Sequence, residues 1–359
     1  MSEEVARMLC DPAFRPVVEA FREGIGAGGA ALAITAGGRI VVDVWHGTRD
    51  EAGTLPWERD TVVNVFSVSK SLVTTLAHVL VRRGLLDLDA PVSAYWPAFR
   101  TRTTVADLLA HRAGLPALRD PMPEGSAYDW DAMTAALAAE PPWWEPGTRH
   151  GYHAVTFGWL VGEVLRRATG TSVRDLVTAE LGPDLHIGLP AHAERRAASV
   201  LPPEGSAGVA PAPGPVALRA FTNPADLLVP GAINTPAARR AQIPAVNGHA
   251  TARALAALHG GLADLLGSDV LARATAPRSD GPDEVLGGRT RFGLGYMLPN
   301  EVRPFAPNPR AFGHTGAGGS LAFADPDLGI GLGYVTNRVL ISPAGPDPRW
   351  TPLLEALYR

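Results

Sequence analysis

Ser67 and Lys70 stand three residues apart in the run Ser67-Val68-Ser69-Lys70, a spacing that places a hydroxyl and an amine on one face of a helix. Lys70 is the only lysine among the 32 lysine and arginine residues of this 359-residue chain. Arginine stays protonated in proteins, whereas burial lowers the pKa of a lysine until its amine works as a base. The pair therefore indicates a serine nucleophile with a lysine base. The alternative is a helix N-cap followed by a solvated charge.

Two further segments carry polar groups in positions suited to such an enzyme. The segment from Glu145 to Val155 places Tyr152 just before a predicted helix. The segment Phe312-Gly313-His314-Thr315-Gly316-Ala317-Gly318-Gly319 places a polar residue on a predicted strand beside a glycine-rich edge. Glycines there let a substrate approach the backbone closely. The alternatives are that Tyr152 is a buried aromatic residue capping a loop, and that Thr315 is a plain strand residue.

Taken together, these segments resemble the three motifs of the serine β-lactamase and DD-peptidase superfamily. The resemblance is nearest to the class C branch, and within it to the β-lactamase-like carboxylesterases of the family VIII type. The segment from Leu108 to Pro116 also resembles the structural loop that this family carries before its tyrosine. The resemblance extends from about residue 30 to the end of the chain.

The resemblance implies a role for each of these residues. Ser67 would be the acylated nucleophile, Lys70 its base or proton relay, and Tyr152 the group that moves protons to the leaving group. The oxyanion hole would use the backbone N–H groups of Ser67 and Ala317. A phenol near a lysine ammonium has a lowered pKa, so we expect Tyr152 and Lys70 to share one proton. The implied substrate-binding residues are His314, Thr315 and Gly316.

The sequence departs from the family pattern at two positions. His314 occupies the place where many relatives carry lysine, and an imidazole attracts a substrate carboxylate less strongly than an ammonium does. Ala154 replaces the asparagine of the class C tyrosine motif, which removes an amide that helps to hold an acylamino side chain. Both changes favour a less polar acyl group over a β-lactam. Tryptophans near the tyrosine segment fit the same interpretation, namely Trp130, Trp143 and Trp144. Taken singly, however, each of them is expected to be a core residue and not a ligand contact.

Hydrophobic periodicity and turn residues predict the elements that position these groups. A first helix should begin at Asp11-Pro12, and a hairpin should join strands 30–35 and 39–45 through Gly37-Gly38. A buried helix should begin at Ser69 and end at Arg82-Arg83-Gly84. The other predicted helices are 105–110, 130–139, 155–168, 173–181, 250–266 and 352–358. The remaining predicted strands are 291–297, 311–314, 320–325 and 329–336.

This order of elements predicts an α/β (α+β) fold, and the resemblance implies that it is of the β-lactamase and transpeptidase type. Strands near both ends of the chain would complete one antiparallel sheet flanked by helices, with a mostly helical lobe inserted. We expect residues 1–85 and 286–359 to form the sheet lobe, residues 86–285 the helical lobe, and the active site to lie between them. The proline-rich stretch 201–217 should be a surface loop or a pocket rim.

Composition excludes several classes of function. The net charge is −4 without a basic stripe, which argues against a nucleic-acid partner. No apolar stretch is long enough for a membrane span, and the acidic N-terminus lacks the pattern of a signal peptide, so a cytoplasmic protein is expected. Cys10 is the only cysteine, and neither a metal nor a nucleotide cofactor is implied.

The sequence therefore predicts a serine hydrolase that forms an acyl-enzyme at Ser67. The favoured activity is a carboxylesterase acting on small or medium hydrophobic esters. The first alternative is an acyltransferase that passes the acyl group to an alcohol or amine in a biosynthetic pathway. A β-lactamase, a D-aminopeptidase or DD-peptidase, and a non-catalytic binding protein are the less favoured alternatives. The expected partner is a small-molecule ester or acyl substrate.

Overall fold

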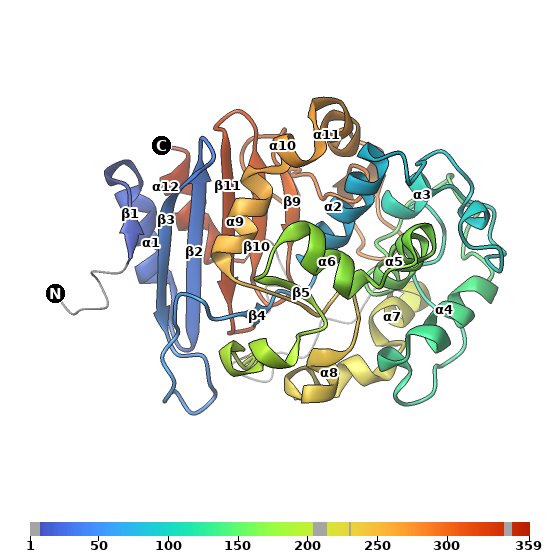
Figure 1. Cartoon of the computed structure of the whole chain (residues 1–359), viewed down its shortest axis with the longest axis horizontal. Helices are drawn as coiled ribbons and strands as arrows, with labels where there is room; N and C mark the ends of the chain where they lie inside the picture. The colour runs from blue at the N-terminus through green and yellow to red at the C-terminus, as the bar shows by residue number, and fades with distance from the viewer. Residues whose placement is uncertain (1–7, 204–213, 230, 341–346) are drawn as a thin grey trace.

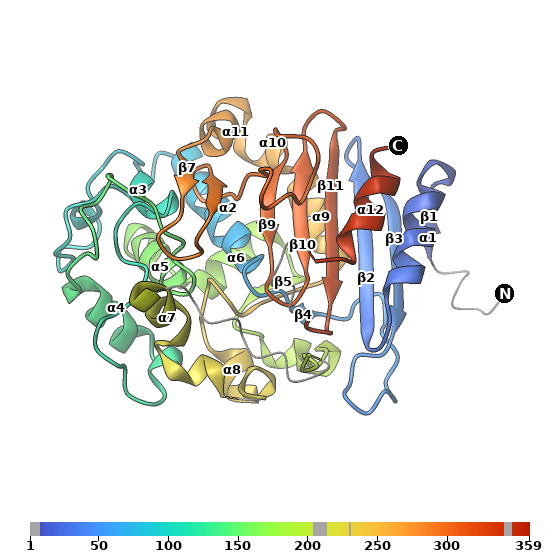
Figure 2. The ribbon, with the colours of Figure 1, turned by 180° about the vertical axis from the view of Figure 1, so that it is seen from behind.

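A computed structural model describes residues 8–203, 214–229, 231–340 and 347–359 (Figure 1). Its main sheet is antiparallel and has six strands in the order β1-β3-β2-β11-β10-β9. Helix α9 (Ala252–Gly260) covers one face, whereas α1 (Arg15–Gly24) and α12 (Trp350–Leu357) cover the other (Figures 1 and 2). The strands are β1 (Leu9–Cys10), β2 (Gly29–Ala36), β3 (Arg39–Gly47), β9 (Phe312–Thr315), β10 (Leu321–Asp325) and β11 (Ile330–Thr336).

The two ends of the chain meet in this sheet, as predicted. Strand β2 pairs with β11 from Ala36↔Ile330 to Ala30↔Thr336, so the N-terminal hairpin and the C-terminal strands form one layer. Gly331 and Gly333 let α9 lie close to this layer. A Cβ atom at these positions would come within 2.2 Å of the Gly260 nitrogen and within 2.3 Å of the Ala252 oxygen. The predicted fold class is therefore confirmed.

The region beside the sheet is mainly helical (Figure 1). Helix α2 (Ser69–Arg82) lies at its centre, packs against neighbouring helices, and is buried from Ser69 to Leu80. This matches the buried helix expected from the sequence. Several other helices match the predicted patches, and three of them begin at a side-chain N-cap, Thr104, Asp129 or Ser172. These helices are α3 (Val105–Leu109), α4 (Trp130–Ala139), α5 (Thr156–Thr169) and α6 (Val173–Leu181).

The predicted helix over 250–266 is wrong at its start and at its centre. Gly248–Ala250 is a strand, β6, which pairs with β4 (Val63–Asn64) and β5 (Leu185–Ile187) in a small second sheet. Thr251 then caps α9, and the helix ends near Gly261 before α10 (Leu262–Leu266) begins. Pairing across the chain therefore overrides the local helical pattern in this segment.

The predicted strand over 291–297 is also shorter than expected. Strand β8 (Arg289–Phe292) forms a hairpin with β7 (Ser279–Pro282), and the chain turns at Gly293 and Gly295. Of the predicted loop 201–217, residues 204–213 lie outside the described part, and α7 (Gly214–Thr222) begins within the remainder. Helices α8 (Pro236–Arg240) and α11 (Ser268–Thr275) were not predicted.

The division into lobes at residues 85 and 286 stays a prediction. Helix α2, from the predicted sheet lobe, packs among the helices, and α9, from the predicted helical lobe, packs on the sheet. Within the described residues, no helix combines the length and the hydropathy that a bilayer crossing requires.

Candidate active site

Ser67 lies in a tight turn between β4 and α2. Phe66, the residue before it, has a φ of 49°, a value that bulky side chains rarely adopt. The Asn64 side chain supports this turn by accepting a hydrogen bond from the Phe66 N–H at 2.8 Å. The Ser69 hydroxyl donates to the Phe66 carbonyl and accepts from the Gly248 N–H. The strained turn is thus held from several sides, and it leaves Ser67 half-buried at the entrance to α2.

The Lys70 amine is fully buried and is held at three points. Its Nζ atom lies 2.7 Å from the carbonyl oxygen of Ala154, 3.0 Å from that of Ala245, and 3.1 Å from the Ser67 hydroxyl oxygen. Burial lowers the pKa of Lys70 well below its ordinary value. Carbonyl oxygens only accept hydrogen bonds, so the two N–H bonds of a neutral amine point at them. Once the amine has lost its proton, its remaining lone pair faces Ser67.

Tyr152 lies in the loop before α5, with its ring 4.7 Å from the Lys70 Nζ atom. The ring stacks on Phe292 at a centroid distance of 5.9 Å, and Tyr152 is only 6% exposed. The expectation that the pKa of Tyr152 is lowered is wrong in direction. Burial raises this pKa far above its ordinary value, and a hydrogen bond with Ser67 opposes that rise only in part. Tyr152 therefore holds its proton at neutral pH.

The buried carboxylate of Asp283 fixes the backbone of Tyr152, a contact that the sequence analysis did not predict. Asp283 follows β7 and accepts a hydrogen bond from the Tyr152 N–H at 3.0 Å. The same carboxylate accepts from the N–H groups of Val285 and Leu286 and from the Thr290 hydroxyl. Tyr152 and Asp283 are 131 positions apart, and no local pattern connects them.

His111 supports the tyrosine loop from the other side. It belongs to the segment that resembles the family's structural loop, and it has a φ of 59°. Its carbonyl accepts from the Gly151 N–H at 3.1 Å, and its Nδ1 atom accepts from the His153 N–H at 3.2 Å. Its ring lies 5.1 Å from that of Tyr152. Burial lowers the pKa of His111 well below its ordinary value, so this support carries no charge.

The third motif lies on β9, at the edge of the main sheet. His314 is fully buried, and its ring is 6.0 Å from that of Tyr152. Burial, reinforced by nearby Lys70, lowers the pKa of His314 to about 3, so the imidazole is neutral. Thr315 is half-buried and directs its hydroxyl at the Met297 sulfur, 3.8 Å away. The substrate-binding roles of His314, Thr315 and Gly316 stay predictions.

The loop after β9 packs directly against the turn that carries Ser67. A Cβ atom on Gly316 would come within 2.5 Å of the Val65 oxygen, and one on Gly318 within 2.5 Å of the Phe66 ring. Within the described part of the chain, the backbone N–H groups of Ser67 and Ala317 have no hydrogen-bond partner. Two unpaired N–H groups on adjoining segments suit the expected oxyanion hole.

The three tryptophans near the tyrosine segment differ in their surroundings. The indole N–H of Trp130 donates to Glu163 at 2.8 Å, and that of Trp143 donates to the Ala117 carbonyl at 2.8 Å. The Trp144 ring lies 6.4 Å from the ring of His153, beside the tyrosine loop. Trp144 is therefore the tryptophan placed nearest to the Tyr152 segment by these contacts.

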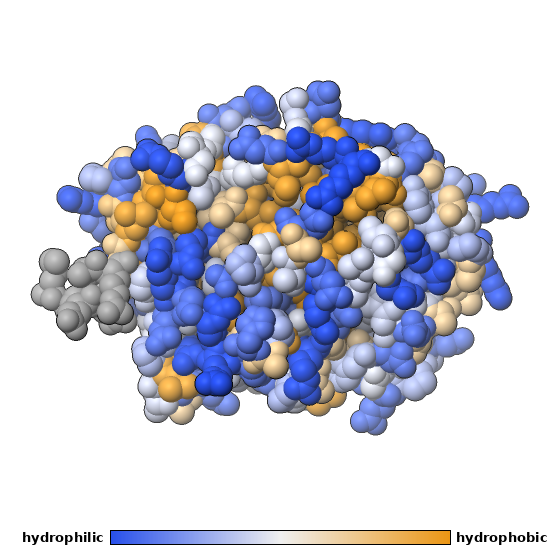
Figure 3. Space-filling model, in the orientation of Figure 1, coloured by the Kyte–Doolittle hydropathy of each residue, from blue (hydrophilic) through white to orange (hydrophobic). Residues whose placement is uncertain are grey.

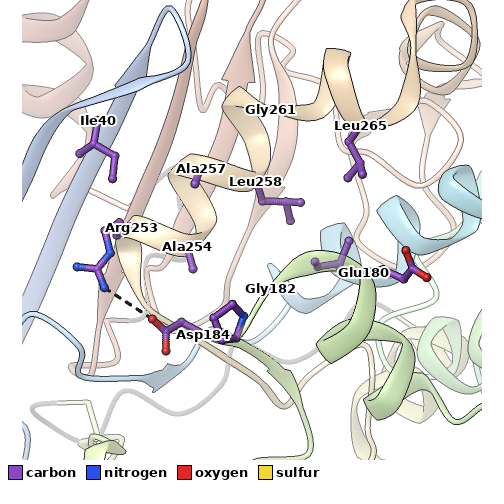
Figure 4. A pocket seen from close by; sticks show the side chains of 12 residues that line it. Ile40, Glu180, Gly182, Asp184, Arg253, Ala254, Ala257, Leu258, Gly261 and Leu265 are labelled. Atoms are coloured by element: carbon purple, nitrogen blue, oxygen red, sulfur yellow. Dashed lines mark ion pairs between the residues drawn. The ribbon is translucent and has the colours of Figure 1, made fainter.

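A separate pocket lies between α9 and the end of α6 (Figure 4), in a part of the surface that is apolar in Figure 3. Its rim carries an ion pair between Arg253 and Asp184, whose atoms are 3.7 Å apart. None of the predicted site residues lines it. Among the described residues, no cluster of three or more His, Cys, Asp or Glu side chains could hold a metal ion.

The fold and the arrangement of the three motifs place the chain in the serine β-lactamase and DD-peptidase superfamily. The chain belongs to the β-lactamase family, whose model matches residues 14–353. It is 38% identical to the "Esterase/beta-lactamase LipL" of Mycobacterium tuberculosis, over 92% of this chain and 82% of that protein.

Two solved structures are similar over nearly the whole chain. One is a family VIII carboxylesterase, with a TM-score of 0.88, 36% identity and 98% of each chain covered. The other is a penicillin-binding protein homologue from Caulobacter crescentus, with a TM-score of 0.88, 35% identity and 98% of each chain covered. These similarities confirm the predicted superfamily and support a serine hydrolase.

Proposed function

We propose that this protein is a carboxylesterase that acts through an acyl-enzyme at Ser67. The observation that carries this proposal is the geometry of Lys70. The Nζ atom of this buried amine contacts two carbonyl oxygens and lies 3.1 Å from the Ser67 hydroxyl oxygen. That distance is within the range for direct proton transfer from the serine to the amine.

In the acylation step, the Ser67 proton passes to Lys70 while the Ser67 oxygen attacks the ester carbonyl carbon. The carbonyl double bond opens, and the N–H groups of Ser67 and Ala317 stabilise the resulting oxyanion. The new ammonium group is stabilised by the carbonyl oxygens of Ala154 and Ala245, which already contact the amine. No rearrangement is needed to accommodate the charge.

Collapse of the tetrahedral intermediate breaks the bond to the leaving alkoxide. Tyr152 gives its proton to the departing oxygen, and Lys70 returns the serine proton to the phenolate. Because burial raises the pKa of Tyr152, the phenol begins the step protonated, as an acid must. In deacylation, water attacks the acyl carbonyl and gives one proton to this pair. The serine oxygen recovers its proton as the acid product leaves.

The electrostatics of the site favour esters without a carboxylate near the scissile bond. Burial lowers the pKa of Lys70 well below its ordinary value, and His314, at the position of the usual lysine, is neutral. Ala154 offers no amide for an acylamino side chain. Similarity to a family VIII carboxylesterase at 36% identity supports the same assignment.

A substrate panel tests this proposal. Purified protein and Ser67→Ala should be compared on nitrophenyl esters of increasing chain length, a chromogenic cephalosporin and D-amino-acid amides. We expect the esters to be the best substrates and Ser67→Ala to lose their turnover. Hydrolysis of the cephalosporin or the amides at the rate of the esters would contradict the assignment. Adding alcohols and amines to the assay distinguishes hydrolysis from transfer, since a transferase would convert the acyl group into a new ester or amide.

A further inference from the structure

The start of the C-terminal helix α12 holds the loop at 316–319, which carries one N–H group of the expected oxyanion hole. The Arg349 side chain donates a hydrogen bond to the Gly318 carbonyl at 3.2 Å, and the Trp350 indole N–H donates to the Gly319 carbonyl at 2.8 Å. Both side chains are buried. Two consecutive carbonyl groups of the loop are therefore bound by two consecutive residues that lie 31 positions further along the chain.

The guanidinium group of Arg349 is itself fixed in place. Its Nε atom and one terminal nitrogen donate to the Asp347 carboxylate at 2.8 and 2.5 Å, and the other terminal nitrogen donates to the Arg338 carbonyl at 2.9 Å. A guanidinium presents its N–H groups in a rigid plane, so these contacts determine the direction of its bond to Gly318. Asp347 is buried beside Arg349 and balances its charge. The pair therefore acts on the loop through hydrogen bonds and not through a net charge.

The loop at 316–319 needs such support, because three of its four residues are glycine. It forms a tight turn in which the Gly319 N–H donates to the Gly316 carbonyl at 2.9 Å. Ala317 is the second residue of this turn, and the hydrogen bond that closes a turn leaves the N–H of the second residue for another partner. Glycines have the greatest backbone freedom of all residues, so the turn alone would hold the Ala317 N–H group only loosely.

Gly319 fits closely against the arginine side chain. It has a φ of 99°, and a Cβ atom at this position would come within 1.9 Å of an Arg349 terminal nitrogen and within 2.5 Å of an Asp347 carboxylate oxygen. A glycine at 319 thus permits the close approach of the ion pair to the backbone of the loop.

We propose that Arg349 and Trp350 are positioning residues that keep the Ala317 N–H group directed at the oxyanion. This inference rests on the proposed function, since it concerns the oxyanion that forms when Ser67 attacks an ester. A donor stabilises such an oxyanion most when it is already aimed at the place where the charge develops. By binding two carbonyl groups of the turn, the two side chains restrict its reorientation during the reaction.

Two substitutions weaken this support by different amounts. Trp350→Phe removes the indole N–H and keeps an aromatic ring in the core, whereas Arg349→Met removes the guanidinium hydrogen bonds and keeps a long side chain. We expect kcat on a nitrophenyl ester to fall about threefold to tenfold for Trp350→Phe and about 10–100-fold for Arg349→Met, with KM changed by less than about twofold. Arg349→Met leaves the Asp347 carboxylate buried without its partner. If that variant does not fold, the double variant Asp347→Asn, Arg349→Met replaces it, because it removes both charges.

The affinity for an alkyl trifluoromethyl ketone separates a positioning role from a general loss of stability. The Ser67 oxygen adds to the ketone carbonyl carbon, its proton passes to Lys70, and the carbonyl double bond opens into an oxyanion bound by the same donors. We expect the dissociation constant of this ketone to rise in each variant by the factor by which kcat/KM falls. The corresponding methyl ketone forms no such oxyanion, so its dissociation constant should not change.

Tyr358→Phe is a matched control for Trp350→Phe, because it also removes one hydrogen-bond donor and keeps the ring. Tyr358 directly follows α12, and its hydroxyl donates at 2.5 Å to Asp325, the last residue of β10. The loop at 316–319 precedes the other end of that strand. This control should lower the melting temperature and leave kcat and the affinity for the ketone unchanged. Melting curves of each variant show whether it is folded.

The proposal is overturned if folded Trp350→Phe and Arg349→Met bind the trifluoromethyl ketone as tightly as the wild type does, or if Tyr358→Phe weakens its binding by the same factor. Failure of the proposed function gives a different result. In that case the wild type would not hydrolyse esters, or Ser67→Ala would still do so. Normal Ser67-dependent hydrolysis with unchanged ketone affinity in both variants would therefore reject the positioning role alone.

Discussion

Replacing Lys70 by methionine should produce a stability difference that depends on pH. Burial lowers the pKa of Lys70 in the folded protein, whereas a lysine in the unfolded chain has a pKa of about 10.4. Between these two values the unfolded chain binds one more proton than the folded protein, so the free energy of unfolding rises with pH. The methionine variant lacks this group and therefore lacks this contribution.

The expected slope of the difference is about 1.4 kcal/mol per pH unit inside this window. When pH 7 and pH 9 both lie inside this window, the free energy of unfolding of the wild type should rise between them by about 2.7 kcal/mol relative to that of the variant. Methionine also leaves the carbonyl oxygens of Ala154 and Ala245 without their donor. That loss costs about 1–3 kcal/mol for each oxygen but does not vary with pH, so the slope reports the lysine.

The measurement is urea unfolding of both proteins at pH 7, 8 and 9, followed by tryptophan fluorescence. Arg82→Met is a matched control, because Arg82 lies on the same helix and also donates to two carbonyl oxygens, those of Asp264 and Leu265. Arginine does not titrate in this range, so its difference from the wild type should be flat. A flat difference for Lys70→Met as well would mean that Lys70 keeps an ordinary pKa, and the base mechanism would lose its physical basis.

Three further substitutions test other parts of the site. Tyr152→Phe keeps the packing on its neighbours but removes the phenolic proton, so kcat should fall by about 10²–10⁴-fold with an unchanged melting temperature; an unchanged kcat would remove Tyr152 from the proton path. Asp283→Ala should lower the free energy of unfolding by about 3 kcal/mol in urea titrations, because several N–H groups lose their acceptor; a loss below about 0.5 kcal/mol would contradict the role given to that carboxylate. Gly318→Ala would place a Cβ atom 2.5 Å from the Phe66 ring, so it should lower the free energy of unfolding by about 1–3 kcal/mol and also lower kcat. Gly24→Ala, with open space around it, should leave kcat unchanged. Equal kinetics for the two glycine variants would show that the loop at 316–319 does not support the turn at Ser67.

The sequence was most informative where function depends on local spacing. Ser67 lies in the turn that leads into α2 and Lys70 in the first turn of that helix, so their contact follows from a separation of three residues. The pairing of the N-terminal hairpin with the C-terminal strands followed from the order of the elements. In both cases short-range pattern or simple topology determines the outcome.

The sequence was least informative where distant segments determine the environment of a group. Burial of Tyr152 depends on Phe292 and other residues far along the chain, so the direction of its pKa shift could not be obtained from the neighbouring Lys70 alone. The contact between Asp283 and Tyr152 joins two loops with no shared pattern. Strand β6 forms because partners from two other parts of the chain pair with it.

The central claim is that Ser67 is acylated with Lys70 as its base. The most direct test is mass spectrometry of the protein after brief exposure to a slowly hydrolysed nitrophenyl ester, followed by peptide mapping. We expect one acyl group per chain, located on Ser67, and labelling of folded Lys70→Met that is slower by about 10³-fold or more. Acylation at another residue, or equal labelling rates for the wild type and Lys70→Met, would contradict the claim.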